Sequence, residues 1–189
     1  FDASKRKWVE GIIYTSTRDI YGFSDTPISE EWAIDIRDCY TGTKLEAERI
    51  LLESDIPSTI LRPSSVYWGG KWVIDIFRRK ISAWETITIN WDGSDKRDFV
   101  HVSDVVEWIL LAVDNIGQED KWIYNIWSHC ILSVSEVAAE VWSRLGIQPT
   151  IEYQASAALW GTIISDIRKA EEELWYSPTH ETLYIPENS

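Results

Sequence analysis

The chain has 189 residues, of which 44% are hydrophobic and 26% charged, a globular composition with room for one ordinary domain or two small ones. Its 31 Asp and Glu against 18 Lys and Arg give a net charge of −13, which argues against a nucleic-acid-binding protein. No apolar run approaches the roughly 18 residues of a membrane span. Cys39 and Cys130 stand apart, which predicts neither a disulfide framework nor a metal site and favours a reducing cytoplasm.

Strand and helix patterns alternate along the chain, which favours an α/β architecture. The predicted elements are, in chain order, a buried strand over 9–15, a helix over 40–52, a strand over 56–61, a helix over 73–81, an exposed strand over 86–89, a strand over 99–102, a helix over 103–113, a strand over 123–126, a helix ending at Gly146 and a helix over 166–174.

Two of these helices have clear start signals. Ser103 is predicted to cap the helix over 103–113, with Asp104 favourably placed in its first turn. Ser133 and Glu136 have the spacing of a capping box, and Gly146 is a fitting end for the helix that they start.

Tyr40 and Lys44 are four residues apart on a predicted helix, so they share one face about one turn apart. A nearby ammonium favours the phenolate form of a tyrosine, and such a tyrosine can take or return a proton on a sugar hydroxyl. Pairs at this spacing also occur by chance in many helices, so the pattern alone carries little weight.

Three further segments end strands or join them to helices. Thr15-Ser16-Thr17 ends the first strand, where open α/β sheets bind ligands, although a simple Ser/Thr turn is the alternative. The segment 61–67 (LRPSSVY) follows the next strand. In the segment 97–104 (RDFVHVSD), Arg97 can clamp a phosphate with its planar fork, or else pair with Asp98.

In this order and spacing, the segments resemble the extended short-chain dehydrogenase/reductase family, in particular its NAD-dependent nucleotide-sugar epimerases and dehydratases. The resemblance runs from Val9 to about Pro178. It implies the C-terminal part of a doubly wound, Rossmann-like parallel sheet over 1–62. A small α/β, mainly substrate-binding domain would occupy 63–189, with some segments returning to the sheet. The implied activity is that of a UDP-glucose 4-epimerase-like enzyme, which transiently oxidises a sugar hydroxyl with NAD or NADP.

The resemblance also assigns roles to individual residues. Tyr40 matches the catalytic acid/base, Lys44 the residue that binds the nicotinamide ribose, and Thr17 the hydroxyl that contacts the substrate. The predicted cofactor-binding residues are Tyr40, Lys44, Pro63 and Ser64, and the predicted substrate-binding residues are Thr17, Ser65 and Arg97, with Arg97 on the diphosphate. The expected partners are a nucleotide sugar and, in the full-length protein, a second copy in a homodimer, with no metal, nucleic acid or membrane.

The chain departs from the family pattern at several points. The Gly-rich turn of the dinucleotide fingerprint is absent, so the chain on its own is expected to be inactive. Arg18-Asp19 stands where 4,6-dehydratases have Asp-Glu, which counts against dehydration. Many epimerases have Asn in place of Ser65, and residues 155–162 contain no second arginine for a phosphate clamp. The alternatives are a non-catalytic nucleotide-sugar-binding fragment, and a reductase or decarboxylase of the same family.

The tryptophan content is unusual. The chain has 12 Trp and 9 Gly, whereas ordinary usage would give roughly 13 Gly. The family has Gly where this chain has Trp68, Trp91, Trp127 and Trp175, and several such glycines serve turns with a positive φ. One hypothesis is a gene read with the wrong meaning of UGA, which encodes Trp in some codes and Gly in others. The alternative is real divergence of the sequence. UGG codons at these four positions would exclude the hypothesis of a misread UGA codon.

Overall fold

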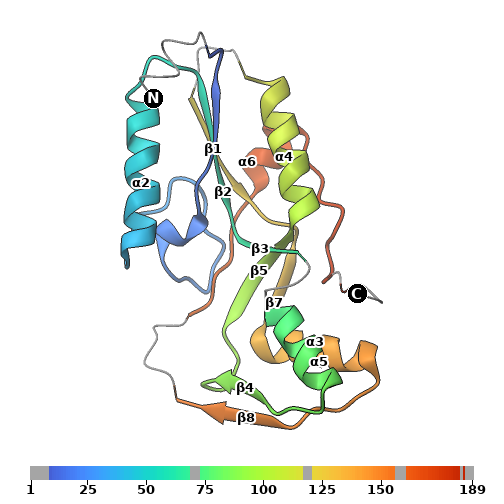
Figure 1. Ribbon diagram of the computed structural model, residues 1–189. Helices are drawn as coiled ribbons and strands as arrows, with labels where there is room; N and C mark the ends of the chain where they lie inside the picture. The colour runs from blue at the N-terminus through green and yellow to red at the C-terminus, as the bar shows by residue number, and fades with distance from the viewer. Residues whose placement is uncertain (1–8, 69–72, 117–120, 156–160, 184, 186–189) are drawn as a thin grey trace.

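The computed structural model describes residues 9–68, 73–116, 121–155, 161–183 and 185, and the predicted α/β architecture is confirmed (Figure 1). Its elements are β1 (Ile12–Thr15), η1 (Arg18–Tyr21), α2 (Cys39–Leu52), β2 (Ser58–Pro63), β3 (Ser65–Tyr67), α3 (Val73–Ser82), β4 (Ile87–Asn90), β5 (Lys96–His101), α4 (Val102–Asp114), β6 (Lys121–Ile126), β7 (Cys130–Ser133), α5 (Val134–Leu145), β8 (Ile151–Gln154) and α6 (Arg168–Leu174).

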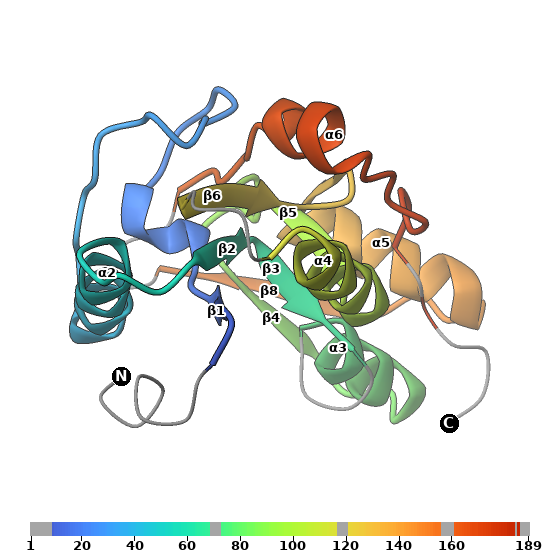
Figure 2. The same ribbon diagram turned by 90° about the horizontal axis from the view of Figure 1, so that it is seen from above.

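The first sheet is parallel, with the strand order β1-β2-β6. Helix α2 covers one face of this sheet, and α4 and α6 cover the other (Figures 1 and 2). All six residues of β2 are buried, as expected for a central parallel strand covered on both faces. Strand β6 begins only at Lys121, so a segment far along the chain from β1 and β2 completes the parallel sheet.

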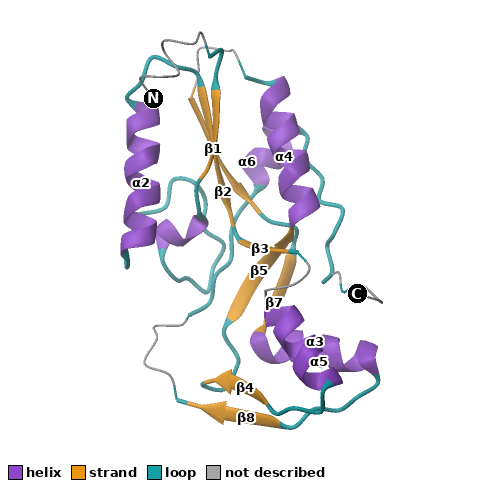
Figure 3. Ribbon diagram, viewed as in Figure 1, coloured by secondary structure: helices purple, strands orange, loops and turns teal. Residues whose placement is uncertain are grey.

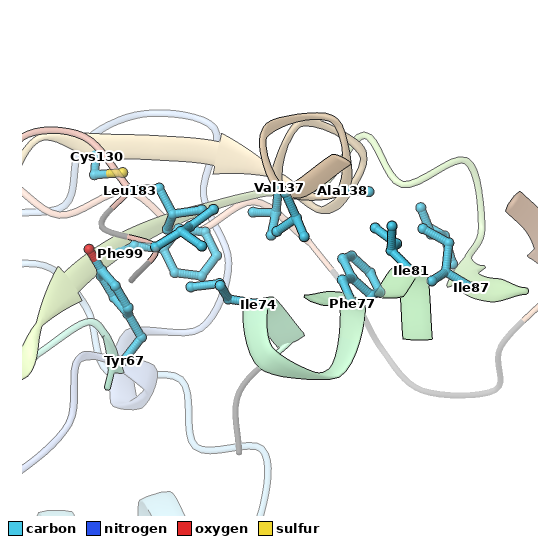
Figure 4. Packing of buried hydrophobic residues seen from close by; sticks show 13 residues of the cluster. Tyr67, Ile74, Phe77, Ile81, Ile87, Phe99, Cys130, Val137, Ala138 and Leu183 are labelled. Atoms are coloured by element: carbon cyan, nitrogen blue, oxygen red, sulfur yellow. The ribbon is translucent and has the colours of Figure 1, made fainter. Parts of the chain in front are cut away.

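The remaining strands form two small sheets, β3-β5-β7 and β4-β8, beside the helices α3 and α5 (Figure 3). Their shared core includes Phe77 and Ile81 from α3 and Val137 and Ala138 from α5, all at most 4% exposed (Figure 4). Burying such aromatic and aliphatic side chains stabilises this part by about 1.5–3 kcal/mol each. One hydrophobic core lies between the parallel sheet and the helices α4 and α6, another lies beside α3 and α5, and these two parts of the chain are called the two bodies below.

The start and end signals of α5 are confirmed. Ser133 Oγ accepts a hydrogen bond from the Glu136 amide at 3.1 Å, and Glu136 Oε2 accepts one from the Ser133 amide at 2.7 Å. Gly146 ends the helix in the left-handed conformation with φ of 66°, which costs a glycine little because it has no Cβ.

Two sequence predictions about local structure were wrong. The cap of α4 is His101, whose ring accepts a hydrogen bond from the Ser103 amide, because the strand ends one residue earlier than predicted, at His101, and the helix begins at Val102. The strand predicted to be exposed over 86–89 is half-buried. Ile87 and Ile89 are at most 1% exposed because β4 pairs with β8 over the core of α3 and α5.

Among the tryptophans that the structure describes, three have a left-handed backbone: Trp84 (φ 58°), Trp91 (φ 54°) and Trp175 (φ 57°). This conformation costs a residue with a Cβ about 1–2 kcal/mol. Trp84 and Trp175 are 79% and 88% exposed, so little burial offsets that cost. Trp91 and Trp175 therefore have the backbone that the glycine hypothesis requires. Trp68 and Trp127 have ordinary φ values, and the hypothesis about the codons stays a prediction.

Replacing Trp84 or Trp175 by glycine should stabilise the protein, because glycine adopts a positive φ without strain. We expect each substitution to add about 1 kcal/mol, which raises the melting temperature by about 2–4 °C in a chain of this size. Trp68→Gly is the matched control, since Trp68 is 51% exposed with an ordinary φ and should gain nothing. Equal losses of melting temperature in Trp68→Gly and Trp175→Gly would contradict the strain argument.

Candidate active site

The first turn of α2 carries the predicted tyrosine. Asp38 caps this helix, since its Oδ1 accepts a hydrogen bond from the Thr41 amide at 2.7 Å. Tyr40 lies inside this turn and is 54% exposed. Lys44 lies one turn later with its Nζ 5.8 Å from the centroid of the Tyr40 ring, and donates a hydrogen bond to the carbonyl of Thr15 at 2.8 Å. The structure therefore brings the predicted Tyr–Lys pair together at the carboxyl end of β1.

Thr17 lies just beyond the same strand end. It is buried and caps η1, with its hydroxyl accepting a hydrogen bond from the Asp19 amide at 3.3 Å. Lys44 holds the carbonyl of Thr15, two residues before Thr17. The three residues assigned to catalysis thus gather at one edge of the sheet, and their catalytic roles stay predictions.

The segment after β2 carries the chain from one body to the other. Pro63 is the last residue of β2, and the Ser64 amide donates a hydrogen bond to the carbonyl of Ile126 at 2.9 Å. The Ser64 hydroxyl donates to the carbonyl of Asp98, and Ser65 begins β3. Because β1 and β2 are parallel and paired, Pro63 ends and Ser64 follows a strand whose carboxyl end lies next to that of Thr15.

A cavity of about 830 Å³ lies between the two bodies. The residues that line it include Asp19, Arg37, Asp38, Thr41, Ser65, Asn90, Arg97 and Phe99. Ser65 and Arg97, which were predicted to bind substrate, are among them. The predicted residues Thr17, Tyr40, Lys44, Pro63 and Ser64 are not, but Asp19 and Thr41 are close neighbours of Thr17 and Tyr40 in the chain. The cavity therefore adjoins the tyrosine rather than enclosing it.

Arg97 reaches this cavity from β5. Its Nη1 donates hydrogen bonds to the carbonyls of Gly161 and of Lys96, the latter at 3.0 Å, and its Cζ lies 5.8 Å from the centroid of the Phe23 ring. Burial lowers the pKa of Arg97. Asp98 is completely buried and accepts a hydrogen bond from the Ser165 amide at 2.7 Å. Successive residues of a strand face opposite sides, so Asp98 lies away from the cavity.

A second arginine, which the sequence analysis missed, lines the same cavity. Arg37 Cζ lies 4.1 Å from the centroid of the Phe23 ring, so the guanidinium groups of Arg37 and Arg97 both lie against this one ring. Asp35 accepts hydrogen bonds from Arg37 at 2.7 Å and 2.6 Å. The second arginine of the phosphate clamp was expected within residues 155–162. No sequence signal connects Arg37 to Arg97 across 60 residues.

A buried ion pair attaches α2 to the sheet. Arg62 Nε donates to Glu48 Oε1 at 3.1 Å and Arg62 Nη2 to Glu48 Oε2 at 2.5 Å, with both side chains at most 5% exposed. Arg62 Nη1 donates to the hydroxyl of Tyr21, which donates to Asn125 Oδ1 at 3.1 Å. One sequence signal pointed to Glu48 as a residue on the same side of the helix, since Glu48 follows Tyr40 and Lys44 at the same four-residue spacing.

Comparison with known proteins identifies the family to which this fold belongs. The model of the NAD dependent epimerase/dehydratase family matches residues 1–126. The chain belongs to this family. It is 32% identical over 182 residues to dTDP-4-dehydro-6-deoxyglucose reductase of Escherichia coli, covering 90% of this chain and 57% of that protein.

Solved structures of the family share the fold. MoeE5 in complex with UDP-glucose and NAD superposes with a TM-score of 0.84 at 28% identity, over 94% of this chain and 62% of that one. UDP-glucose 4-epimerase of Thermotoga maritima gives a TM-score of 0.80 at 26% identity, over 94% and 61%. The chain thus spans about three fifths of the relatives that it matches, and its parallel sheet corresponds to part of their Rossmann-like domain.

The described ranges of this family member contain neither a candidate metal cluster nor a candidate membrane span. Within 9–68, 73–116, 121–155, 161–183 and 185, no group of three or more His, Cys, Asp or Glu side chains has a geometry that could hold a metal ion. In the same ranges, no helix is long and apolar enough to cross a bilayer.

Asp98 should make the stability of the protein depend on pH. Burial raises its pKa to about 6, while the nearby Arg18 opposes the shift. The folded protein therefore binds this proton more tightly than the unfolded chain, in which an Asp has a pKa of about 3.9. The free energy of unfolding should gain about 1 kcal/mol from this group as the pH falls from 7 to 5.

Melting curves of the parent and of Asp98→Asn at pH 7 and pH 5 measure this contribution. We expect the gain on acidification to be smaller in Asp98→Asn, and to be kept in Asp25→Asn, a change at an exposed position. An identical pH dependence in the parent and Asp98→Asn would show that Asp98 does not titrate in this range.

Proposed function

We propose that this chain carries the acid–base and substrate-binding part of an NAD-dependent nucleotide-sugar epimerase. The observation that carries the proposal is the Tyr40–Lys44 pair, held on the carbonyl of Thr15 beside a cavity with two arginines. Relatives that act on nucleotide sugars, including the T. maritima UDP-glucose 4-epimerase, support this class of substrate. The cavity of about 830 Å³ lies in the range that small-molecule sites occupy.

The residues fit the nicotinamide end of NAD. The exposed Tyr40 phenol and the Lys44 ammonium lie at the carboxyl end of β1, where they would hold the nicotinamide ribose, and Pro63 and Ser64 follow the neighbouring strand end. When bound, NAD supplies a reversible hydride acceptor. The Gly-rich turn that holds the pyrophosphate in this family does not occur in the 189 residues.

In the proposed reaction, Tyr40 would remove the proton of a sugar hydroxyl while the carbon that bears it gives up a hydride, for which bound NAD would be the acceptor. Lys44 stabilises the phenolate, and Thr17 orients the hydroxyl. The proton and the hydride then return to the sugar, and epimerisation follows when the hydride enters the opposite face of the ring. Arg97 and Arg37 hold the diphosphate, so that the sugar can turn without leaving the cavity.

One specific observation favours a second candidate. The relative with 32% identity is a reductase, and a reductase needs the same tyrosine and lysine for the transfer of a hydride and a proton to a keto sugar, without the first step in which the sugar is oxidised. Analysis of products distinguishes the two candidates, because an epimerase interconverts two nucleotide sugars without net consumption of NAD, whereas a reductase consumes a reduced cofactor stoichiometrically.

Tyr40→Phe tests the acid/base. In the chain completed with the Gly-rich dinucleotide-binding region of the family, we expect turnover to fall by about 10²–10⁴-fold, the usual contribution of a general acid or base. The melting temperature should change little, because Tyr40 is 54% exposed. Turnover equal to that of the parent would remove Tyr40 from the mechanism.

Arg97→Ala tests the substrate site. Charge-assisted hydrogen bonds contribute about 1.5–3 kcal/mol, so the affinity of the chain for UDP-glucose, measured by calorimetry, should fall roughly 10- to 150-fold. Arg49→Ala is the control, since Arg49 lies at the surface of α2 and pairs with Glu46 and Glu53. A lower melting temperature with unchanged affinity in Arg97→Ala would instead assign Arg97 a structural role.

A further inference from the structure

The side of α2 that carries Tyr40 and Lys44 also carries Glu48, one turn further on. The three side chains differ in their surroundings. Tyr40 is exposed, Lys44 holds the carbonyl of Thr15 on β1, and Glu48 is 1% exposed against Arg62 on β2. The helix is therefore attached to two neighbouring strands through polar groups on the same side that presents the tyrosine.

Arg62 binds two segments at once. Its Nε and Nη2 hold both oxygens of Glu48, and its Nη1 holds the hydroxyl of Tyr21 in η1. Burial raises the pKa of Tyr21 to about 12, so this hydroxyl stays protonated and donates to Asn125 on β6. Because η1 begins directly after Thr17, one guanidinium joins the helix of Tyr40 to the turn of Thr17.

Few other buried groups hold α2 in place. Apart from Glu48, its buried residues are Thr41, which serves the cap, and Leu51. Leu45 packs against the small cluster that contains Ile20 and Tyr21. Apolar contacts of this kind are non-directional, whereas two parallel N–H···O bonds from a planar guanidinium fix a direction. Among the buried groups, the ion pair therefore contributes the strongest directional constraint on the angle of α2 about its own axis, beside the hydrogen bond from Lys44 to the carbonyl of Thr15.

We infer that Glu48 and Arg62 are positioning residues, which set the placement of Tyr40 relative to Thr17 for the reaction. This inference rests on the proposed function, and neither residue lines the cavity. A displacement of about 1 Å at a reacting group can cost about 10²-fold in rate. Loss of the pair should therefore reduce turnover while leaving the affinity for substrate nearly unchanged.

The test replaces both partners together. A single substitution leaves one buried charge without its partner and is strongly destabilising, whereas two apolar side chains of similar size are often tolerated. We expect Glu48→Leu/Arg62→Met, in the NAD-loaded full-length enzyme, to melt within a few degrees of the parent. Its kcat should fall about 10- to 100-fold, with KM for the nucleotide sugar within about threefold of the parent.

Hydrogen exchange gives a readout that does not depend on activity. In the double variant, the amides of residues 17–22 should exchange faster although neither substitution lies in that segment, and those of β6 should exchange at the parent's rate. Tyr21→Phe keeps the ion pair and removes the hydrogen bonds of η1 to Arg62 and to Asn125, so it should accelerate the same amides and reduce kcat by a smaller factor. If the double variant does not fold, the exchange rates and kcat of Tyr21→Phe test the inference in its place.

Arg49→Met is the matched control on the same helix, because its ion pairs with Glu46 and Glu53 are exposed, and it should change neither readout. A kcat within twofold of the parent in a folded double variant or, if that variant does not fold, in Tyr21→Phe would overturn the inference. Unchanged exchange at residues 17–22 would overturn it as well. A parent enzyme that turns over no nucleotide sugar would instead overturn the proposed function, and exchange would then still report whether Arg62 couples the two segments.

Discussion

The arrangement of the candidate site depends on the buried ion pair between Glu48 and Arg62. The two charges lie away from water, so their desolvation is offset only by good geometry and by hydrogen bonds to the remaining donors. Arg62 meets this requirement with three partner atoms, two on Glu48 and one on Tyr21. The same requirement fixes α2 and η1 relative to β2. Tyr40 and Thr17 thereby belong to one rigid unit although 22 residues separate them in the chain.

The parallel sheet supplies the second constraint. In parallel strands the carboxyl ends lie at one edge, so the groups that follow β1 and β2 converge there. Residues 63–65 leave this edge and begin the second body, which places β3 and β5 opposite α2. The cavity between the bodies is therefore lined from both sides, by Asp38 and Arg37 before α2 and by Arg97 on β5.

The cavity brings two arginines together in a chain of net negative charge, although Asp19, Asp38 and Asp95 also line it. The net charge is −13, which repels an anionic ligand at long range, whereas opposite charges in a cleft attract it at short range. Arg37 and Arg97 provide that attraction, and both rest on the ring of Phe23. A flat aromatic surface holds guanidinium groups without neutralising them, whereas the ion pair with Asp35 offsets part of the charge of Arg37.

The sequence by itself determined the α/β class, the α5 capping box and the Tyr40–Lys44 pair, because each depends on residues close together in the chain. It also gave the order of the longer elements, but it missed η1 and the short strands β3, β7 and β8. The positive φ at Trp91 and Trp175 also agrees with a pattern visible in the sequence. Only the tertiary structure decided that His101 caps α4, that Ile87 and Ile89 are buried, and that Arg37 lies beside Arg97. It alone also brought Glu48 to Arg62 and Tyr21. These outcomes depend on which segments pack together, and the period of a hydrophobic pattern gives the face of an element but not its neighbour.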